Sequence, residues 1–268
     1  MRFAGSVLAL AVLAGPACAQ RPELIAQSEL RVCADPANLP YSNQSKEGFE
    51  NKIAEIVGHD LGLPVAYVWF PQVVGFVRNT LGTRACDLVM GAVAGDTIMD
   101  TTNPYYHTGY MLVTRASDAI AATSVSDPAI AAKRFGVIAA TPPTDLLLAH
   151  GLLPSTTSYA LNTDTRVHNP ARDMLVDLVD NKIDVALVWG PIADYAIAHD
   201  HMPLKAVFLQ PEPGGPRLDY RIAMGVRANE PEWRRRINQA ITHQRSAIDA
   251  VLHDYGIESV DVSDTAKP

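Results

Sequence analysis

The stretch DLVMGAVAGDTIMDTTNPYYHTGYMLV, residues 87–113, decides the fold class of this 268-residue chain. It begins with an apolar run at residues 88–90, which is typical of a strand buried on both faces of a sheet. Small residues at 91–95 follow, at the carboxyl end of the strand, where open α/β sheets bind their ligands. Pro-Tyr-Tyr then leads into a second expected strand at 110–113. We therefore predict a buried strand with a ligand-facing loop.

Strands and helices alternate on the amino-terminal side of this stretch. Apolar runs predict strands at 30–35, 64–70 and 86–90. A helix is expected after the first strand, because apolar residues recur at the spacing of one helix face: Phe49, Ile53, Ile56, Val57 and Leu61. Gly62 ends this helix, and a second helix is expected around residues 76–81. This alternation predicts a parallel, doubly wound sheet.

The alternation restarts beyond residue 113. Strands are expected at 135–139 and 184–188. Thr141 precedes two prolines and Asn169 precedes one, which is typical of a helix N-cap with proline in the first turn. A return strand at 221–226 is followed by one long final helix, expected from residue 231 to about residue 254.

These elements predict an α/β protein of two lobes, each a doubly wound and mostly parallel sheet. Lobe 1 is expected to combine residues 24–113 with residues 221–268, and lobe 2 to comprise residues 114–220. The chain then crosses between the lobes twice, at hinges expected near 114–116 and 218–221.

The first 19 residues have the pattern of a secretory signal peptide. A positive start is followed by an apolar run at 7–13 and by the small-x-small sequence Ala17-Cys18-Ala19. The run is too short to span a bilayer. Cleavage is expected after Ala19, because the residues before Cys18 lack the large apolar side chain that a lipoprotein signal prefers. We expect an exported, periplasmic protein with no membrane insertion.

The mature chain is acidic. The full sequence has 22 Lys and Arg against 29 Asp and Glu, and removal of Arg2 with the signal peptide leaves 21 against 29, a charge of −8 with neutral histidines. This balance argues against nucleic acid and against anionic membrane surfaces as partners.

Two cysteines remain after cleavage, Cys33 and Cys86, both next to or within predicted neighbouring strands. An oxidising compartment favours a disulfide between them. Two buried free thiols are the alternative, since a bridge requires Cα atoms within about 7 Å.

Short motifs along the mature chain resemble those of periplasmic solute-binding proteins of the two-lobe type, type II. The motifs share their order and spacing with that family and lie at 30–41, 48–50, 87–91, 103–106 and 184–191. The resemblance implies the two-lobe fold with two hinge crossings.

A narrower resemblance is to the MoxJ/XoxJ type, binding-protein-like factors encoded beside quinoprotein methanol dehydrogenases. It is carried by RVCADP at 31–36, GFENKI at 48–53, WFPQ at 69–72, GFVRNTL at 75–81 and CDLVMG at 86–91. This resemblance implies a non-catalytic accessory protein without a cofactor of its own. Its implied partner is a PQQ-dependent methanol dehydrogenase, with the lanthanide-using kind included, together with the cytochrome c of that enzyme. The main alternative is the receptor of an ABC transporter for an uncharged or weakly polar small molecule.

Both charged anchors of an amino-acid receptor are missing. Amino-acid binders of this fold clamp the ligand carboxylate with an arginine shortly after the small-residue loop, whereas residues 93–99 contain none. The aspartate that binds the ligand's amino group corresponds to Trp189. An apolar, aromatic cleft is therefore expected, because a buried unpaired charge is costly.

Candidate cleft residues lie at the ends of the predicted strands or on the loops that follow them: Asp35, Tyr41, Phe49, Gly91, Ala92, Tyr105, Tyr106, Thr141 and Trp189. Tyr41 and Trp189 are expected to face each other across the gap between the lobes. For Phe49, core packing is the favoured alternative, and for Asp35 it is local capping of a turn.

No catalytic or metal-binding motif is present in the sequence. There is no nucleophile elbow, zinc signature or phosphate-binding loop. The only histidine cluster, at 199–201, supplies two ligands, which makes an incomplete site. Four carboxylates lack the spacing of an oxygen-ligand loop and are expected to be solvated: Glu47, Glu50, Asp96 and Asp100.

Overall fold

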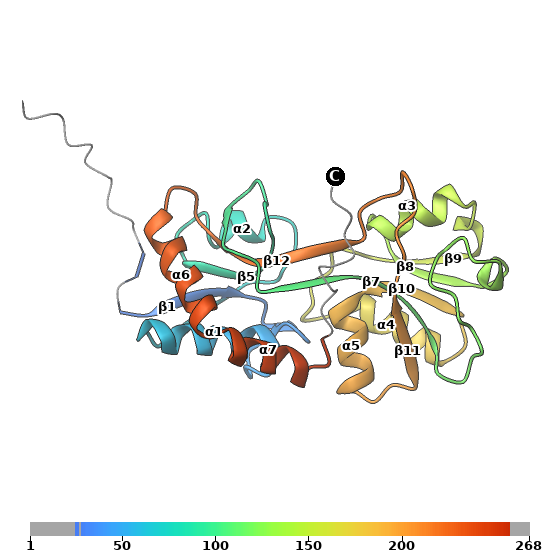
Figure 1. The fold of residues 1–268 in the computed structure, drawn as a ribbon, viewed down its shortest axis with the longest axis horizontal. Coiled ribbons are helices and arrows are strands. Elements are labelled where there is room, and N and C mark those ends of the chain that lie inside the picture. The colour runs from blue at the N-terminus through green and yellow to red at the C-terminus, as the bar shows by residue number, and fades with distance from the viewer. Residues whose placement is uncertain (1–24, 27, 258–268) are drawn as a thin grey trace, which may run out of the picture.

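The computed structural model describes residues 25–26 and 28–257, which form two α/β lobes (Figure 1). The predicted signal peptide and its cleavage site lie outside the described residues. Within the described part of the chain, none of the helices is long and apolar enough to cross a bilayer.

Lobe 1 is built on a parallel sheet with one antiparallel strand beside it. β1 (Leu30–Ala34) lies between β4 (Val65–Trp69) and β5 (Leu88–Val93) and is parallel to both. β12 (Asp219–Val226) pairs antiparallel with β5, and the short β6 (Asp100–Thr101) pairs with β12. A two-strand ladder of β2 (Ala37–Asn38) and β3 (Ser42–Asn43) forms the loop after β1.

Both faces of this sheet are covered, as the near-continuous apolar strands predict. Leu88 and Met90 face one cluster with α1 (Phe49–Leu61), α6 (Pro231–His243) and α7 (Arg245–Asp254). Val89, between them, faces a second cluster that includes Phe76 of α2 (Phe76–Asn79). Figure 1 shows α2 on the opposite side of the sheet from α1 and α7.

The expected single helix at the carboxyl end is two helices. α6 ends at His243 and α7 begins at Arg245, with Gln244 between them at φ −101° and ψ 15°. The Gln244 amide donates a hydrogen bond of 2.8 Å to the Asp60 carboxylate at the end of α1. This tertiary contact stabilises the break, and sequence periodicity gives no sign of it.

Lobe 2 repeats the arrangement around β10 (Val185–Trp189). β10 is parallel to β8 (Phe135–Ile138), which is parallel to β9 (Thr156–Tyr159). On its other side β10 pairs antiparallel with β7 (Tyr106–Arg115), and β7 also pairs with β11 (Leu204–Phe208).

Three helices and two short 3-10 helices complete lobe 2. α3 (Pro142–Ala149), α4 (Pro170–Val179) and α5 (Gly190–Ala198) cover the sheet, and the 3-10 helices span Pro128–Ile130 and Leu153–Ser155. Thr141 and Asn169 occupy the N-cap positions that the sequence predicts, and the Asn169 side chain accepts a hydrogen bond of 3.0 Å from the Arg172 backbone N–H.

β7 and β12 connect the lobes (Figure 1). Residues 106–109 of β7 pair with β12, and residues 110–113 pair with β10. One continuous ten-residue strand therefore runs through both lobes and changes partner between Gly109 and Tyr110. It is longer than the strand at 110–113 that the sequence predicts. At the same level the Tyr110 N–H donates to the Leu218 carbonyl at 2.8 Å, just before β12 begins. The lobe boundaries given above remain a prediction.

Asp87 ties three elements of lobe 1 together. Its carboxylate is 1% exposed and pairs with Arg31 of β1 at 2.7 Å and with Arg227, just after β12, at 2.6 Å. Its carbonyl accepts a hydrogen bond of 2.9 Å from the Trp233 indole of α6. Burial by itself would raise the pKa of Asp87, but the hydrogen bonds and charges of the two arginines lower it below its ordinary value.

A disulfide lies next to Asp87 and its partners. Cys33 of β1 and Cys86, immediately before Asp87, are bridged, with their Cα atoms 5.4 Å apart. Of the two alternatives that the sequence left open, the structure contains the bridge.

Candidate functional site

A cleft between the lobes is the candidate site. We use the name interlobe cleft for two adjoining cavities of about 380 Å³ and 280 Å³ that share Tyr41, Gln72, Tyr110 and Trp189 as lining residues. Tyr41 and Gln72 belong to lobe 1, and Trp189 ends β10 of lobe 2. The cleft is therefore built by both lobes, and its shape depends on how they are placed.

Aromatic rings form most of the wall of the larger cavity. On one side, Trp189 lies between Tyr110 and Tyr220, with ring centroids 5.1 Å and 5.8 Å away. Tyr41 and Tyr106 line the same cavity, and each packs on the buried ring of Phe49, at 5.5 Å and 6.0 Å. These rings are preorganised by their mutual packing, because each is held by at least one other ring.

The second cavity extends the cleft into lobe 2. Thr141, at the N-cap of α3, lines it together with three residues of the loop that follows β9: Leu161, Thr163 and Thr165. The Thr141 hydroxyl donates to the Ile138 carbonyl at 2.6 Å, so its donor is used within the lobe.

One carboxyl group lies in the larger cavity. Glu50, in the first turn of α1, is 7% exposed, and its side chain packs so closely on Gly91 that a Cβ there would lie 2.4 Å from Oε1. Among the described residues it has no hydrogen-bond or ion-pair partner. Burial raises the pKa of Glu50 to about 8, so at neutral pH this carboxyl group is largely protonated.

The expectation that Glu50 is a solvated loop carboxylate is wrong. α1 buries a broad face that includes Glu50 and Asn51 as well as the predicted Ile53 and Val57, and the carboxyl end of Glu50 packs on Gly91 of β5. Glu47 is exposed as expected. Asp96 accepts a hydrogen bond from the Ile98 N–H of its own loop, and Asp100 lies 3.5 Å from Arg234.

Five of the nine predicted residues line the cleft: Tyr41, Gly91, Tyr106, Thr141 and Trp189. Phe49, Ala92 and Tyr105 do not, because they are buried in the core of lobe 1. Phe49 and Tyr105 are completely inaccessible, which agrees with the core alternative for Phe49.

Asp35 acts between the lobes rather than in the cleft wall. Its carboxylate accepts hydrogen bonds from the Ala37 N–H at 2.9 Å and the Gln72 N–H at 2.6 Å, as a turn cap does. It also accepts one of 2.7 Å from the Thr165 hydroxyl of lobe 2. A second bridge is formed by the ring of Tyr255, after α7, which stacks on Tyr195 of α5 at 6.0 Å.

Six residues that the sequence did not indicate also line the larger cavity: Glu50, Gln72, Val93, Tyr110, Tyr220 and Ile222. Tyr110 and Tyr220 lie on the two crossing strands, β7 and β12, at the point where these pass between the lobes. Side chains on the cleft-facing side of a crossing strand border the cleft, whereas neighbours such as Thr108 and Arg221 do not, so the crossing position alone is a partial signal.

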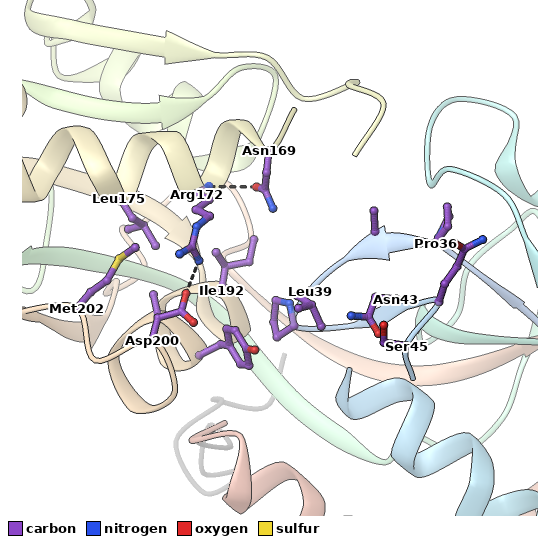
Figure 2. Close-up of a pocket in the computed structure, with 15 residues that line it drawn as sticks. Pro36, Leu39, Asn43, Ser45, Asn169, Arg172, Leu175, Ile192, Asp200 and Met202 are labelled. Carbon is purple, nitrogen blue, oxygen red and sulfur yellow. Dashed lines mark hydrogen bonds and ion pairs between the residues drawn. The ribbon is translucent and has the colours of Figure 1, made fainter. Parts of the chain in front are cut away.

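A third hollow of about 630 Å³ also spans the lobes (Figure 2). The loop around Leu39 and Asn43 of lobe 1 faces Arg172 and Asp200 of lobe 2 across it. Arg172 donates to the Asp200 carboxylate, so the charges of this hollow neutralise each other. Within the described part of the chain, no three His, Cys, Asp or Glu residues are grouped to hold a metal ion.

Two α/β lobes, two crossing strands and an aromatic cleft between the lobes define a two-lobed binding protein. The family model of the bacterial extracellular solute-binding proteins, family 3, matches residues 30–254.

Relatives make this assignment narrower. The crystal structure of the periplasmic binding protein XoxJ from Methylobacterium extorquens AM1 is 37% identical, with 87% of this chain and 99% of that chain covered and a TM-score of 0.74. The MxaJ structure from Methlophaga aminisulfidivorans MPT is 26% identical over 86% of this chain and 100% of that chain, with a TM-score of 0.79. The MoxJ protein of Paracoccus denitrificans is 27% identical over 88% of this chain and 91% of its own. The chain belongs to the bacterial extracellular solute-binding proteins, family 3, and within it to the MoxJ/XoxJ type.

Proposed function

We propose that this protein is a non-catalytic periplasmic accessory protein that assists the assembly or activation of a PQQ-dependent methanol dehydrogenase through its interlobe cleft. The observation that carries the proposal is the 37% identity to XoxJ over nearly the whole of that chain. The proposed partner, a methanol dehydrogenase, comes from the motifs that this chain shares with factors encoded beside such enzymes. We further propose that the protein reaches the periplasm by cleavage of its signal peptide after Ala19.

The composition of the cleft argues against a free amino acid as the ligand. Neither cavity of the interlobe cleft is lined by an arginine, lysine or aspartate among the described residues, and Glu50 is its one ordinarily charged group. A free amino acid would bring a carboxylate into a space without a cation, beside an acidic side chain. Burial of a neutral polar group without a hydrogen-bond partner costs on the order of 2–7 kcal/mol, and burial of an unpaired carboxylate costs more.

The same composition supports a non-catalytic role. General acid–base catalysis needs two groups whose pKa values are set apart near the working pH. Apart from Glu50, the titratable lining groups of the larger cavity are tyrosines, and burial raises the pKa of Tyr110 to about 12. A base that complements Glu50 is not among the described lining residues.

The test uses purified mature protein and a periplasmic methanol dehydrogenase in its apo and PQQ-loaded forms. We expect association with the apo form in a pull-down and in calorimetry, together with faster recovery of dehydrogenase activity when PQQ is added. Trp189→Ala should weaken the association at least tenfold, because it removes the ring at the centre of the cleft wall. Leu148→Ala is the matched control, since Leu148 is 61% exposed on α3 and does not line the cleft. Absence of both association and activation would contradict the proposal.

A transport receptor for a small molecule is the second candidate. The larger cavity, about 380 Å³, falls in the range of about 300–1,000 Å³ that is usual for small-ligand sites. Stoichiometric, micromolar binding of a small solute with no effect on the dehydrogenase would favour this candidate over the accessory function.

A further inference from the structure

The buried carboxyl group of Glu50 is the most unusual feature of the interlobe cleft. Buried acidic side chains in proteins are normally paired with cations or hydrogen-bonded. Glu50 is neither among the described residues, although it is 7% exposed and lines a cavity that a ligand could enter. The Glu50 carboxyl group can therefore form hydrogen bonds or an ion pair with a ligand.

The surroundings of Glu50 select the chemistry of that ligand. Five rings border the same cavity as its carboxyl group: Tyr41, Tyr106, Tyr110, Trp189 and Tyr220. The face of an aromatic ring carries negative potential, and rings arranged around a cavity bind ammonium ions, above all methylated ones. Tyr220 already takes part in such a contact on one side, because the Arg217 guanidinium lies 4.7 Å from its ring centroid.

We propose that the larger cavity of the interlobe cleft binds a small organic ammonium ion, with its methyl groups against the aromatic rings and its charge balanced by Glu50. This inference uses the same cleft as the proposed function. Its test, however, needs no dehydrogenase, so the two proposals can fail separately. A cationic ligand differs from the uncharged or weakly polar ligand expected from the sequence, because Glu50 lies in the cavity and not in solvent.

Binding of a cation is coupled to loss of a proton. In the empty cleft the carboxyl group holds its proton near neutral pH, since burial raises the pKa of Glu50 to about 8. Burial is the cause of this shift, and the neighbouring phenols of Tyr41, Tyr105 and Tyr106 stay neutral because burial raises their pKa values well above 10. Asp194 of α5 acts on Tyr41 from the other lobe. A bound ammonium ion stabilises the carboxylate, and the proton passes from Glu50 to solvent.

Gly91 makes room for this carboxyl group. Its missing side chain leaves the space that Glu50 Oε1 occupies, 2.4 Å from where a Cβ would lie. The backbone of β5 is thus shaped to accept the Glu50 side chain at the edge of the cavity. Gly91 belongs to this strand and not to the small-residue loop expected from the sequence, because β5 continues to Val93.

The experiment is a calorimetric titration of the mature protein with choline and, in parallel, with 3,3-dimethylbutan-1-ol, which has the same shape but no charge. We expect the affinity for choline to exceed that for the neutral alcohol at least tenfold. Between pH 6 and pH 8 the dissociation constant for choline should fall by up to tenfold per pH unit, with release of close to one proton per ligand at pH 6.5. Tetramethylammonium serves as a second probe of fixed charge.

Two variants separate the charge from the rings. Glu50→Gln keeps the shape of the side chain and should abolish both the preference for choline and the pH dependence. Tyr220→Leu should weaken choline binding several-fold, while Tyr220→Phe, which keeps the ring, should remain within about twofold of the parent. Equal binding of choline and the alcohol, pH-independent binding, unchanged binding by Glu50→Gln, or no binding of either ammonium ion would each overturn the proposal.

Discussion

Asp87 and Glu50 are both buried acidic side chains of lobe 1, yet their surroundings are opposite. Asp87 is 1% exposed and lies between two arginines, which lower its pKa. Glu50 is 7% exposed and has no partner among the described residues, so burial raises its pKa to about 8. A buried charge with all its partners holds strands and helices together, whereas a buried carboxyl group without partners is available to a ligand.

The largest effect is expected from Asp87→Asn. The change leaves Arg31 and Arg227 facing a neutral amide, and loss of one partner from a buried ion pair costs about 3–5 kcal/mol. Urea unfolding with the disulfide intact measures the free energy of unfolding. Asp164→Asn is the control, since Asp164 pairs with Arg166 at the surface and should leave the midpoint unchanged. Equal midpoints for the two variants would contradict the structural role of Asp87.

Glu50→Gln should raise the free energy of unfolding at alkaline pH, whereas Asp87→Asn lowers it. In the parent the folded state keeps the Glu50 proton up to pH about 8, whereas the unfolded state loses it near pH 4.3. Stability therefore falls by about 1.4 kcal/mol per pH unit between these values and is level above them. The Glu50→Gln variant does not lose stability in this way, because its side chain does not titrate.

Unfolding of parent and Glu50→Gln protein at pH 4, 6 and 8 tests this expectation. The two proteins should have similar free energies of unfolding at pH 4, and the variant should gain about 2 kcal/mol relative to the parent between pH 6 and pH 8. Parallel pH profiles would show that Glu50 titrates normally and would remove the contrast with Asp87.

A smaller effect is expected from Trp233→Phe. The Trp233 indole donates 2.9 Å to the Asp87 carbonyl, and both groups are buried. Phenylalanine keeps most of the apolar contact but leaves the carbonyl with one donor fewer, which costs about 1–2 kcal/mol. The midpoint of urea unfolding should fall accordingly. The double variant with Asp87→Asn should be less destabilised than the sum, because the two changes affect one network.

The smallest change in stability is expected from Gly91→Ala. The new Cβ displaces the Glu50 carboxyl group, and the free energy of unfolding should fall by less than about 1 kcal/mol because the displaced atoms end a flexible side chain. Choline binding should weaken more than stability does. In a Glu50→Asp background, whose shorter side chain leaves room for the methyl group, Gly91→Ala should have little further effect. A loss of equal size in both backgrounds would mean that Gly91 does not shape the site through Glu50.

Much of the fold could be predicted from the sequence. Apolar runs located the parallel strands β1, β4, β5, β8 and β10 but not β9, whose residues Thr156–Tyr159 are mostly polar. The N-cap patterns at Thr141 and Asn169 located two helix starts. These signals are local and therefore readable. The break at Gln244 and the single long strand β7 depend on contacts with distant residues, such as Asp60 and β12, and periodicity could not show them.

The site was less predictable for the same reason. Trp189 and Tyr41 were expected in the cleft because the ends of parallel strands meet there. Glu50 looks like any acidic residue in the first turn of a helix, where such residues are common and exposed. Its burial arises only when the fold brings α1 against β5, where the Glu50 carboxyl group packs on Gly91, a residue distant in the sequence.

The most direct test of this account is the pKa of Glu50 itself. Infrared difference spectra between the parent protein and Glu50→Gln isolate the stretch of one carboxyl group, recorded from pH 4 to pH 10 without ligand. We expect a protonated carboxyl signal at neutral pH that disappears with a midpoint near pH 8 and is lost at neutral pH when choline is added. A midpoint near pH 4 to 5, with a carboxylate already present in the empty cleft, would show that Glu50 is not a buried, unpartnered group available for a cation.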